Sequence, residues 1–139
     1  MFETLISKLQ EDKYLTLETT PQHEPSMHNI VEKIKKFKID SKVDGFTCTD
    51  NPLAKLKYNS LFAALKLQQE FKKPVIATMT MRDRNKIALQ SDLLGANDFD
   101  IRAILALTGD PANMSDQPNS KGVFEANSLM LLKMIKSFN

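Results

Sequence analysis

The sequence has few residues from which a metal site or a disulfide could be built. Its 139 residues include one cysteine, Cys48, and two histidines, His23 and His28. A single cysteine excludes an internal disulfide and a cysteine-based zinc site, and it suits a reducing compartment. Because the two histidines are five residues apart, we expect no metal pair, with His23 in a loop and His28 near the start of a helix.

The chain also lacks a long apolar run and a large excess of either charge. Its N-terminal segment, M-F-E-T-L-I-S-K-L-Q-E-D, has no continuous apolar stretch of the signal-peptide kind, and no run approaches a membrane-spanning length. The 19 basic and 17 acidic residues are interspersed, unlike those of a nucleic-acid-binding surface. We therefore expect a soluble, cytoplasmic protein that binds neither membranes nor nucleic acid.

The common nucleotide-binding and nucleophile motifs are missing as well. The chain contains no G-x-G-x-x-G, no P-loop and no G-x-S-x-G. Cys48 follows an apolar run, so we interpret it as a small core residue rather than a nucleophile. Any catalytic function must come from a different arrangement of residues.

What the sequence does contain is four apolar runs, each followed by helical spacing, at intervals of about thirty residues. The predicted strands are Tyr14–Leu17, Val43–Cys48, Val75–Met81 and Ile101–Leu107. The predicted helices run from about Ser26 to Phe37, Lys55 to Phe71, Asp83 to Ala96 and Val123 to Phe138, after a short amphipathic segment at Phe2–Gln10. The hydrophobic content of 42% is enough for the core of one domain, 1–139.

This pattern predicts an α/β fold made of four successive βα units. A closed (β/α)8 barrel needs about 250 residues, so the chain corresponds either to half of such a barrel or to a small open, doubly wound parallel sheet. Periodicity does not separate the two. In detail, we expect Ile101–Leu107 to be buried on both faces, Asp83 to cap a helix, and Gly95 to end that helix in a left-handed cap.

Polar residues follow each predicted strand at the same end. They are Glu18, then Thr49, Asp50 and Asn51, then Thr78, Thr80, Arg82 and Asp83, and finally Thr108, Gly109 and Asp110. The carboxyl ends of parallel strands share one edge, and α/β proteins bind ligands there. Glu18 and Asp110 are candidates for general-acid and electrostatic roles. The alternative for Asp110 is that it only caps the turn before Pro111.

Several sequence words also occur in a known family. L-T-L-E-T-T-P, T-C-T-D-N-P, T-M-T-M-R-D-R-N, L-Q-S-D-L-L-G-A and I-L-A-L-T-G-D-P, with V-F-E-A-N-S after the loop, stand in this order between Leu15 and about Leu132. Together they resemble the methylenetetrahydrofolate reductase family. The resemblance implies a (β/α)8 barrel with FAD at the carboxyl ends of the strands. It also implies reduction of 5,10-methylenetetrahydrofolate to 5-methyltetrahydrofolate by NADH or NADPH.

The resemblance assigns roles to individual residues. Glu18 matches the family's general acid, and Asp110 matches the aspartate between flavin and folate. The other matched positions, all flavin contacts, are Thr49, Thr78 where several members have a histidine, and the backbone of Leu107, Thr108 and Gly109.

Because only four units are present, we expect the chain to be incomplete for catalysis alone. Half a barrel would leave two unpaired strand edges, so we expect self-association or a complementing half-barrel. Two alternatives remain open. One is a non-catalytic remnant that binds folate or flavin, and the other is an interaction module that uses the open edges.

Overall fold

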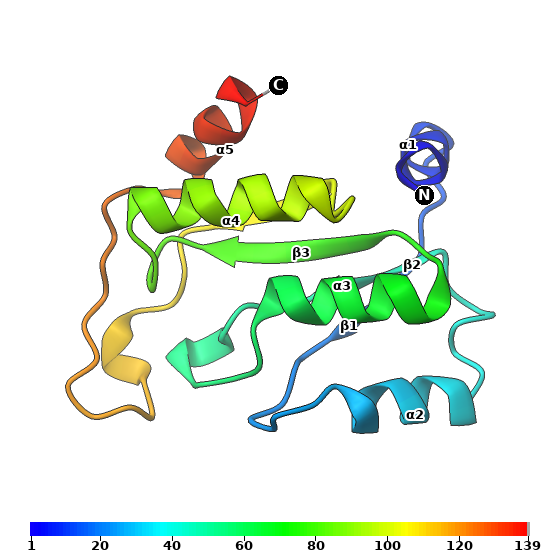
Figure 1. Cartoon of the computed structure of the whole chain (residues 1–139), viewed down its shortest axis with the longest axis horizontal. Coiled ribbons are helices and arrows are strands. Elements are labelled where there is room, and N and C mark those ends of the chain that lie inside the picture. The colour runs from blue at the N-terminus through cyan, green and yellow to red at the C-terminus, as the bar shows by residue number, and fades with distance from the viewer. Residues whose placement is uncertain (139) are drawn as a thin grey trace.

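The computed structural model describes residues 1–138 and contains one sheet of four parallel strands (Figure 1). The strands are β1 (Thr16–Thr19), β2 (Gly45–Cys48), β3 (Val75–Thr80) and β4 (Ala103–Leu107). They pair in the order β1-β2-β3-β4. This confirms the prediction of an α/β fold with four parallel strands.

Each strand leads to the next through a helix. After α1 (Phe2–Gln10), which precedes β1, the helices are α2 (His28–Lys36), α3 (Ser60–Phe71), α4 (Lys86–Asp98) and α5 (Ser128–Ser137), with short 3-10 turns η1 (Pro52–Ala54) and η2 (Ala112–Met114). In Figure 1, β3 points to the left, so the loops with η1 and η2 lie at the carboxyl ends of the strands and α1 lies at the amino ends. Among the described residues, no helix is both long and apolar enough to cross a membrane.

The core lies between the helices and one face of the sheet. Side chains in register across the strands, such as Leu17, Phe46 and Val75, pack with Val31 of α2 and Leu67 of α3. A second cluster joins the end of β3 and β4 to α4 and α5. Because right-handed crossovers between successive neighbouring strands put their helices on the same side, one face of the sheet carries the core.

The opposite face of the sheet is covered by no helix of residues 1–138. Glu18, Thr47 and Ile76 are in register on this face, and Leu105 and Leu107 follow on β4 by the two-residue alternation of a strand. Leu105 is 44% exposed and Leu107 42% exposed. The prediction that this strand is buried on both faces is therefore wrong, because α4 and α5 cover only one of them.

The strand order also bears on the two architectures left open by the sequence. A doubly wound sheet reverses its strand order and carries helices on both faces, whereas successive units of a (β/α)8 barrel add strands in sequence. The observed order has no reversal. The fold is consistent with half of a (β/α)8 barrel, or with an open parallel sheet that has its helices on one side.

Two helices begin later than their apolar spacing predicted. The α3 helix starts at Ser60, not near Lys55, because the Asn59 side chain accepts hydrogen bonds from the first-turn N–H groups. The α5 helix starts at Ser128, where the Asn127 side chain caps the first turn. In both cases an asparagine that satisfies otherwise unpaired N–H groups sets the start.

The two predicted caps of α4 are wrong. Asn85 caps this helix by accepting the N–H of Ala88 at 2.9 Å, while the carboxylate of Asp83 pairs with Arg82 instead. Gly95 lies inside α4, which continues to Asp98. A competing ion pair and a longer helix, neither of them visible in local spacing, account for the two differences.

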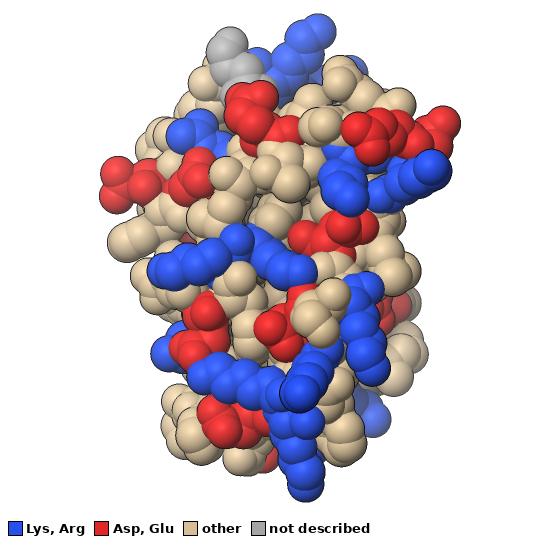
Figure 2. Space-filling view, turned by 90° about the vertical axis from the view of Figure 1, so that its right-hand side faces the viewer, with Lys and Arg blue, Asp and Glu red and all other residues tan. Residues whose placement is uncertain are grey.

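The surface carries charges of both signs. Figure 2, which faces the side where α1 lies in Figure 1, shows lysine and arginine side chains interspersed with aspartate and glutamate. Several are paired, such as Lys35 with Glu70 and Lys8 with Asp44.

Inside the sheet, Cys48 is fully buried as a free thiol, and burial raises its pKa to about 11. The interpretation of Cys48 as a core residue is confirmed.

Candidate functional site

The predicted site residues lie in or just beyond the carboxyl half of the sheet, but Glu18 and Asp110 are at opposite edges of it. Glu18 is exposed on β1, and Asp110 follows β4. These are the two edge strands, and three strand spacings amount to about 14 Å along the sheet. Glu18 and Asp110 therefore do not form a carboxylate pair, and a ligand that touches both would have to extend across the sheet.

Asp110 holds a turn that belongs to a different loop. Its Oδ2 accepts the backbone N–H of Leu53 at 2.7 Å. The alternative was that Asp110 caps the turn before Pro111, whereas this hydrogen bond joins it to η1. Gly109 makes this approach possible. It has a φ of +100°, and a Cβ there would lie 3.1 Å from the Cβ of Arg82 and 3.2 Å from that of Thr80.

The η1 turn that Asp110 holds is strained. Asn51, Leu53 and Ala54 have φ values of 44°, 56° and 57°. Asparagine tolerates this left-handed region, but it costs residues such as Leu53 and Ala54 about 1–2 kcal/mol each. Hydrogen bonds hold the segment in place. Asp116 Oδ1 accepts the N–H of Leu56 at 3.0 Å, and this bond is the main cause that lowers the pKa of Asp116.

Arg82 fastens the loop after β2 to the loop after β3. Its side chain is 2% exposed. Nε and Nη2 donate to the Asp83 carboxylate at 2.7 and 2.6 Å, and Nη2 also donates to the Asn51 carbonyl oxygen at 3.0 Å. The hydrogen bonds from Arg82 lower the pKa of Asp83. The first half of the R-D-R-N word thus has a structural role at the edge of the site.

Asp50 and Arg84 form a second, more deeply buried pair. The Asp50 side chain is 1% exposed. Its Oδ2 accepts from both the N–H and the hydroxyl of Thr80 at 3.0 Å and from Arg84 Nη1 at 2.7 Å. Arg84 Nε donates to Asp92 of α4 at 2.9 Å. The sequence reading grouped Asp50 with the ligand-facing residues, whereas the structure uses it to join β2, β3 and α4.

Comparison with known proteins decides the family. The family model described as methylenetetrahydrofolate reductase matches residues 3–139. The chain belongs to the methylenetetrahydrofolate reductase family. This confirms the resemblance in the sequence words, and it places the chain among folate-related reductases. A search of curated proteins found no match.

Members of the methylenetetrahydrofolate reductase family generally use FAD, and the residues at the carboxyl edge suit such a ligand. Within residues 1–138, three buried side-chain polar atoms have no hydrogen-bond partner. Two of them, Thr49 Oγ1 and Arg82 Nη1, belong to this edge, and buried polar groups normally have a partner. Thr49 is also one of the flavin contacts that the resemblance implies. The free hydroxyl therefore fits a polar ligand above β2.

A hollow of about 180 Å³ with a mixed polar and apolar lining includes Arg82. Three loops at the carboxyl ends of β2, β3 and β4 contribute its lining, which includes Asn51, Arg82, Asp83, Gln117 and Lys121. Thr78 is buried in β3, and the hydroxyl of Thr108 accepts the N–H of Ser128 at 3.3 Å. The Thr108 hydroxyl thus contacts the start of α5, and the Thr108 carbonyl accepts the N–H of Met81 at 3.1 Å.

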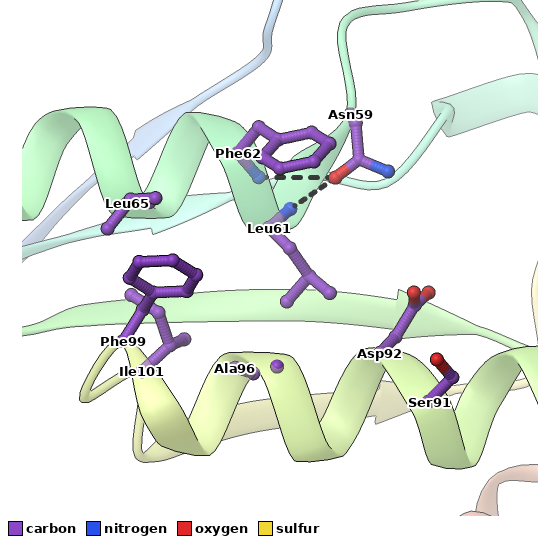
Figure 3. A pocket seen from close by; sticks show the side chains of 10 residues that line it. Asn59, Leu61, Phe62, Leu65, Ser91, Asp92, Ala96, Phe99 and Ile101 are labelled. Atoms are coloured by element: carbon purple, nitrogen blue, oxygen red, sulfur yellow. Dashed lines mark hydrogen bonds between the residues drawn. The ribbon is translucent and has the colours of Figure 1, made fainter.

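A second hollow lies in the helix layer, away from the predicted residues. It has a volume of about 140 Å³ between α3 and α4. Figure 3 shows Leu61 and Leu65 of α3 facing Ala96 and Phe99 of the α4 side, with Asp92 at one end. Its lining is mainly apolar, and no predicted site residue contributes to it. We therefore assign the candidate site to the carboxyl edge of the sheet.

Sequence reasoning missed the groups that organise this edge. Arg84, Asp92 and Asp116 appear in no predicted site, although each makes a hydrogen bond that orders a loop. A partial signal exists for the arginine, because alternating charges in R-D-R-N follow a strand whose neighbour ends in Asp50. Asp116 has no such signal, because its partner is a backbone N–H 60 residues away.

Proposed function

We propose that this chain takes part in the FAD-dependent reduction of 5,10-methylenetetrahydrofolate to 5-methyltetrahydrofolate by NADH or NADPH, within one-carbon metabolism and methionine biosynthesis. The observation that carries the proposal is the family match over residues 3–139. The collection of the matched positions at one edge of a parallel sheet supports it. We further propose that residues 1–139 form one domain, equivalent to the amino-terminal half of the barrel, and that it works in the cytoplasm, to which one free, buried thiol is suited.

FAD, when bound, would supply hydride transfer from the nicotinamide to the folate. Glu18 would act as a proton donor. Its carboxyl is exposed on the open face of β1, so a folate lying on this face could reach it. There it would give a proton to the folate nitrogen as that nitrogen's bond to the bridging methylene breaks. A positioned general acid contributes about a hundred- to ten-thousandfold in rate.

The other matched residues would bind and orient. Asp110, fixed by the Leu53 N–H, would place a negative charge beside the flavin and steady positive charge on the pterin. The Thr49 hydroxyl, buried without a partner among the described residues, would hydrogen-bond a polar edge of the flavin. Thr78 and the backbone of 107–109 would line the same site.

We also propose that a second body covers the open face, either another copy of this chain or a complementing half-barrel. β1 and β4 each have one strand neighbour, and unpaired edges readily pair with other strands. Leu105 and Leu107 add exposed apolar surface on the same face. Closing this face would complete a barrel and enclose the site that Glu18 and Asp110 flank.

A visible absorption spectrum tests the flavin proposal directly. Purified chain, alone and with its complementing half, would be titrated with FAD and passed through a desalting column. We expect flavin absorbance to remain with the protein. The matched variant Thr49→Val, which removes the free hydroxyl and keeps the side-chain shape, should retain less. If wild-type protein binds no FAD under either condition, the reductase proposal fails, and a folate-binding remnant or an interaction module becomes the better account.

A further inference from the structure

The turn that contacts Asp110 is held from two sides. Its first end is held by Asp110, which accepts the N–H of Leu53, and its last end is held by Asp116, which accepts the N–H of Leu56. Between them, Lys55 N–H donates to the Pro52 carbonyl at 3.2 Å and closes the turn. Both carboxylates come from the loop between β4 and α5, so one loop holds both ends of the other.

The strain in this turn requires such support. Leu53 and Ala54 are left-handed residues with side chains, and this conformation persists only where surrounding contacts enforce it. Asn51 has further anchors, since its side chain accepts the N–H of Lys57 at 2.8 Å and its carbonyl accepts from Arg82. Within residues 52–56, the Asp116 contact is the hydrogen bond at the Leu56 end, and its loss would release that end. Relaxation of Leu53 toward ordinary backbone angles would then turn its N–H away from Asp110.

Asp116 is itself fixed. Gln117 Nε2 donates to its Oδ1 at 3.3 Å, and the N–H of Gln117 donates to Ser115 Oγ at 3.0 Å. His23, in the loop between β1 and α2, is a titratable neighbour from another element, and its electrostatic interaction also lowers the pKa of Asp116. The carboxylate is thus held in the orientation in which it accepts the Leu56 N–H.

We propose that Asp116 is a positioning residue for Asp110. It holds the far end of residues 52–56, which keeps the Leu53 N–H directed at Asp110 and so fixes the orientation of that carboxylate. Asp116 touches no ligand in this scheme and acts through the peptide backbone. The proposal rests on the proposed function in one respect, namely that Asp110 acts beside the flavin.

Amide hydrogen exchange tests the positioning without any flavin. Asp116→Ala removes the acceptor, and we expect the amides of both Leu56 and Leu53 to exchange at least about tenfold faster. Asp116→Asn keeps an acceptor oxygen and should restore slow exchange at both. The control is Asp44→Ala at the amino ends of the strands. Asp44 likewise accepts a backbone N–H, that of Leu15 at 2.9 Å, so its loss should affect Leu15 and leave Leu53 unchanged.

Three results would overturn the proposal. Faster exchange at Leu56 alone would show that the turn does not transmit the contact to Leu53. Faster exchange throughout the sheet, or failure of the alanine variant to fold, would mark Asp116 as a general structural residue. Failure of the asparagine variant to rescue Leu53 would show that the hydrogen bond is not the cause.

A FAD titration then separates this proposal from the proposed function. If wild type binds FAD, we expect Asp116→Ala to weaken binding about tenfold and to change the visible spectrum of bound flavin, with Asp116→Asn close to wild type. Unchanged binding and an unchanged spectrum in the alanine variant would overturn the link to the flavin. If wild type binds no FAD, the reductase proposal fails, while amide exchange still decides whether Asp116 positions Asp110.

Discussion

The buried pair between Asp50 and Arg84 allows a quantitative prediction about stability. Asp50→Asn keeps the size of the side chain but removes the charge that faces Arg84. The new amide N–H can also face Thr80 and Arg84, which are themselves hydrogen-bond donors. Asp50 accepts two hydrogen bonds from Thr80 as well as the Arg84 contact. The variant therefore leaves a guanidinium whose side chain is only 12% exposed without its main partner.

The expected loss follows from this burial. Removing one member of a buried pair costs about 3–5 kcal/mol. Arg84 keeps its contact with Asp92 at 2.9 Å, which places the loss near the lower end, at about 3 kcal/mol. Domains are stable by about 5–15 kcal/mol, so the variant should fold but melt about 10 °C below wild type.

Urea unfolding and thermal melts followed by circular dichroism measure this loss. The control is Asp100→Asn, whose exposed pair with Arg102 should contribute less than about 1 kcal/mol. A double-mutant cycle with Arg84→Met should show a double variant less destabilised than the sum of the two single variants. A loss below about 1 kcal/mol in Asp50→Asn, with an unchanged dependence on urea, would refute the argument that this pair joins the strand ends.

Four further outcomes are expected. Gly45→Ala should destabilise the chain by at least about 1–3 kcal/mol, because the added Cβ would overlap the hydroxyl of Tyr14; an unchanged urea midpoint would contradict this. Glu18→Gln should slow folate reduction about a hundred- to ten-thousandfold and leave flavin reduction by the nicotinamide nucleotide intact, whereas Asp110→Asn should alter both. Stopped-flow measurement of each half-reaction distinguishes the two variants. If Glu18→Gln slows flavin reduction as much as folate reduction, Glu18 has a structural role. Light scattering at micromolar concentration should show self-association, and a clean monomer would count against it. Because the folded pKa of Asp116 is lowered, its hydrogen bond stabilises the fold above its unfolded pKa of about 3.9 and is lost as pH falls through the lower folded value. Protection of the Leu56 amide, taken as its exchange rate relative to the intrinsic rate at the same pH, should therefore fall only in acid; a loss of protection near neutral pH would contradict this.

The sequence by itself determined the order and type of the main elements. Apolar runs that end in proline, glycine or aspartate located the four strands, because these residues are disfavoured inside strands and common in the turns that follow them. Three- and four-residue spacing located the helices, although two of them start later than predicted. The family could also be inferred from the sequence, because short motifs such as R-D-R-N and L-T-G-D-P consist of consecutive residues. These are local properties, and local information suffices for them.

Tertiary structure alone decided how the residues at the carboxyl edge are used. Asp83 and Asn85 are both good helix caps, and the choice between them depends on Arg82, whose other partner comes from the loop after β2. Asp50 was predicted to face a ligand, but in the structure its carboxylate binds Arg84, 34 positions away in the chain. Arg82 is next to Asp83 in the chain, but its second partner, Asn51, is 31 residues away, and Asp50 and Arg84 are 34 residues apart, so no periodicity within one segment could indicate these contacts.

The same reason explains one wrong prediction and one missed contact that matter for function. Leu105 and Leu107 read as buried because apolar runs indicate the chemistry of a strand but not whether anything covers each of its faces. Asp110 was correctly placed at the end of β4, yet its partner, the strained backbone at Leu53, lies 57 residues away. Because hydrogen bonds and burial depend on which segments meet in space, the positions of the candidate residues followed from the sequence, whereas their contacts followed only from the folded chain.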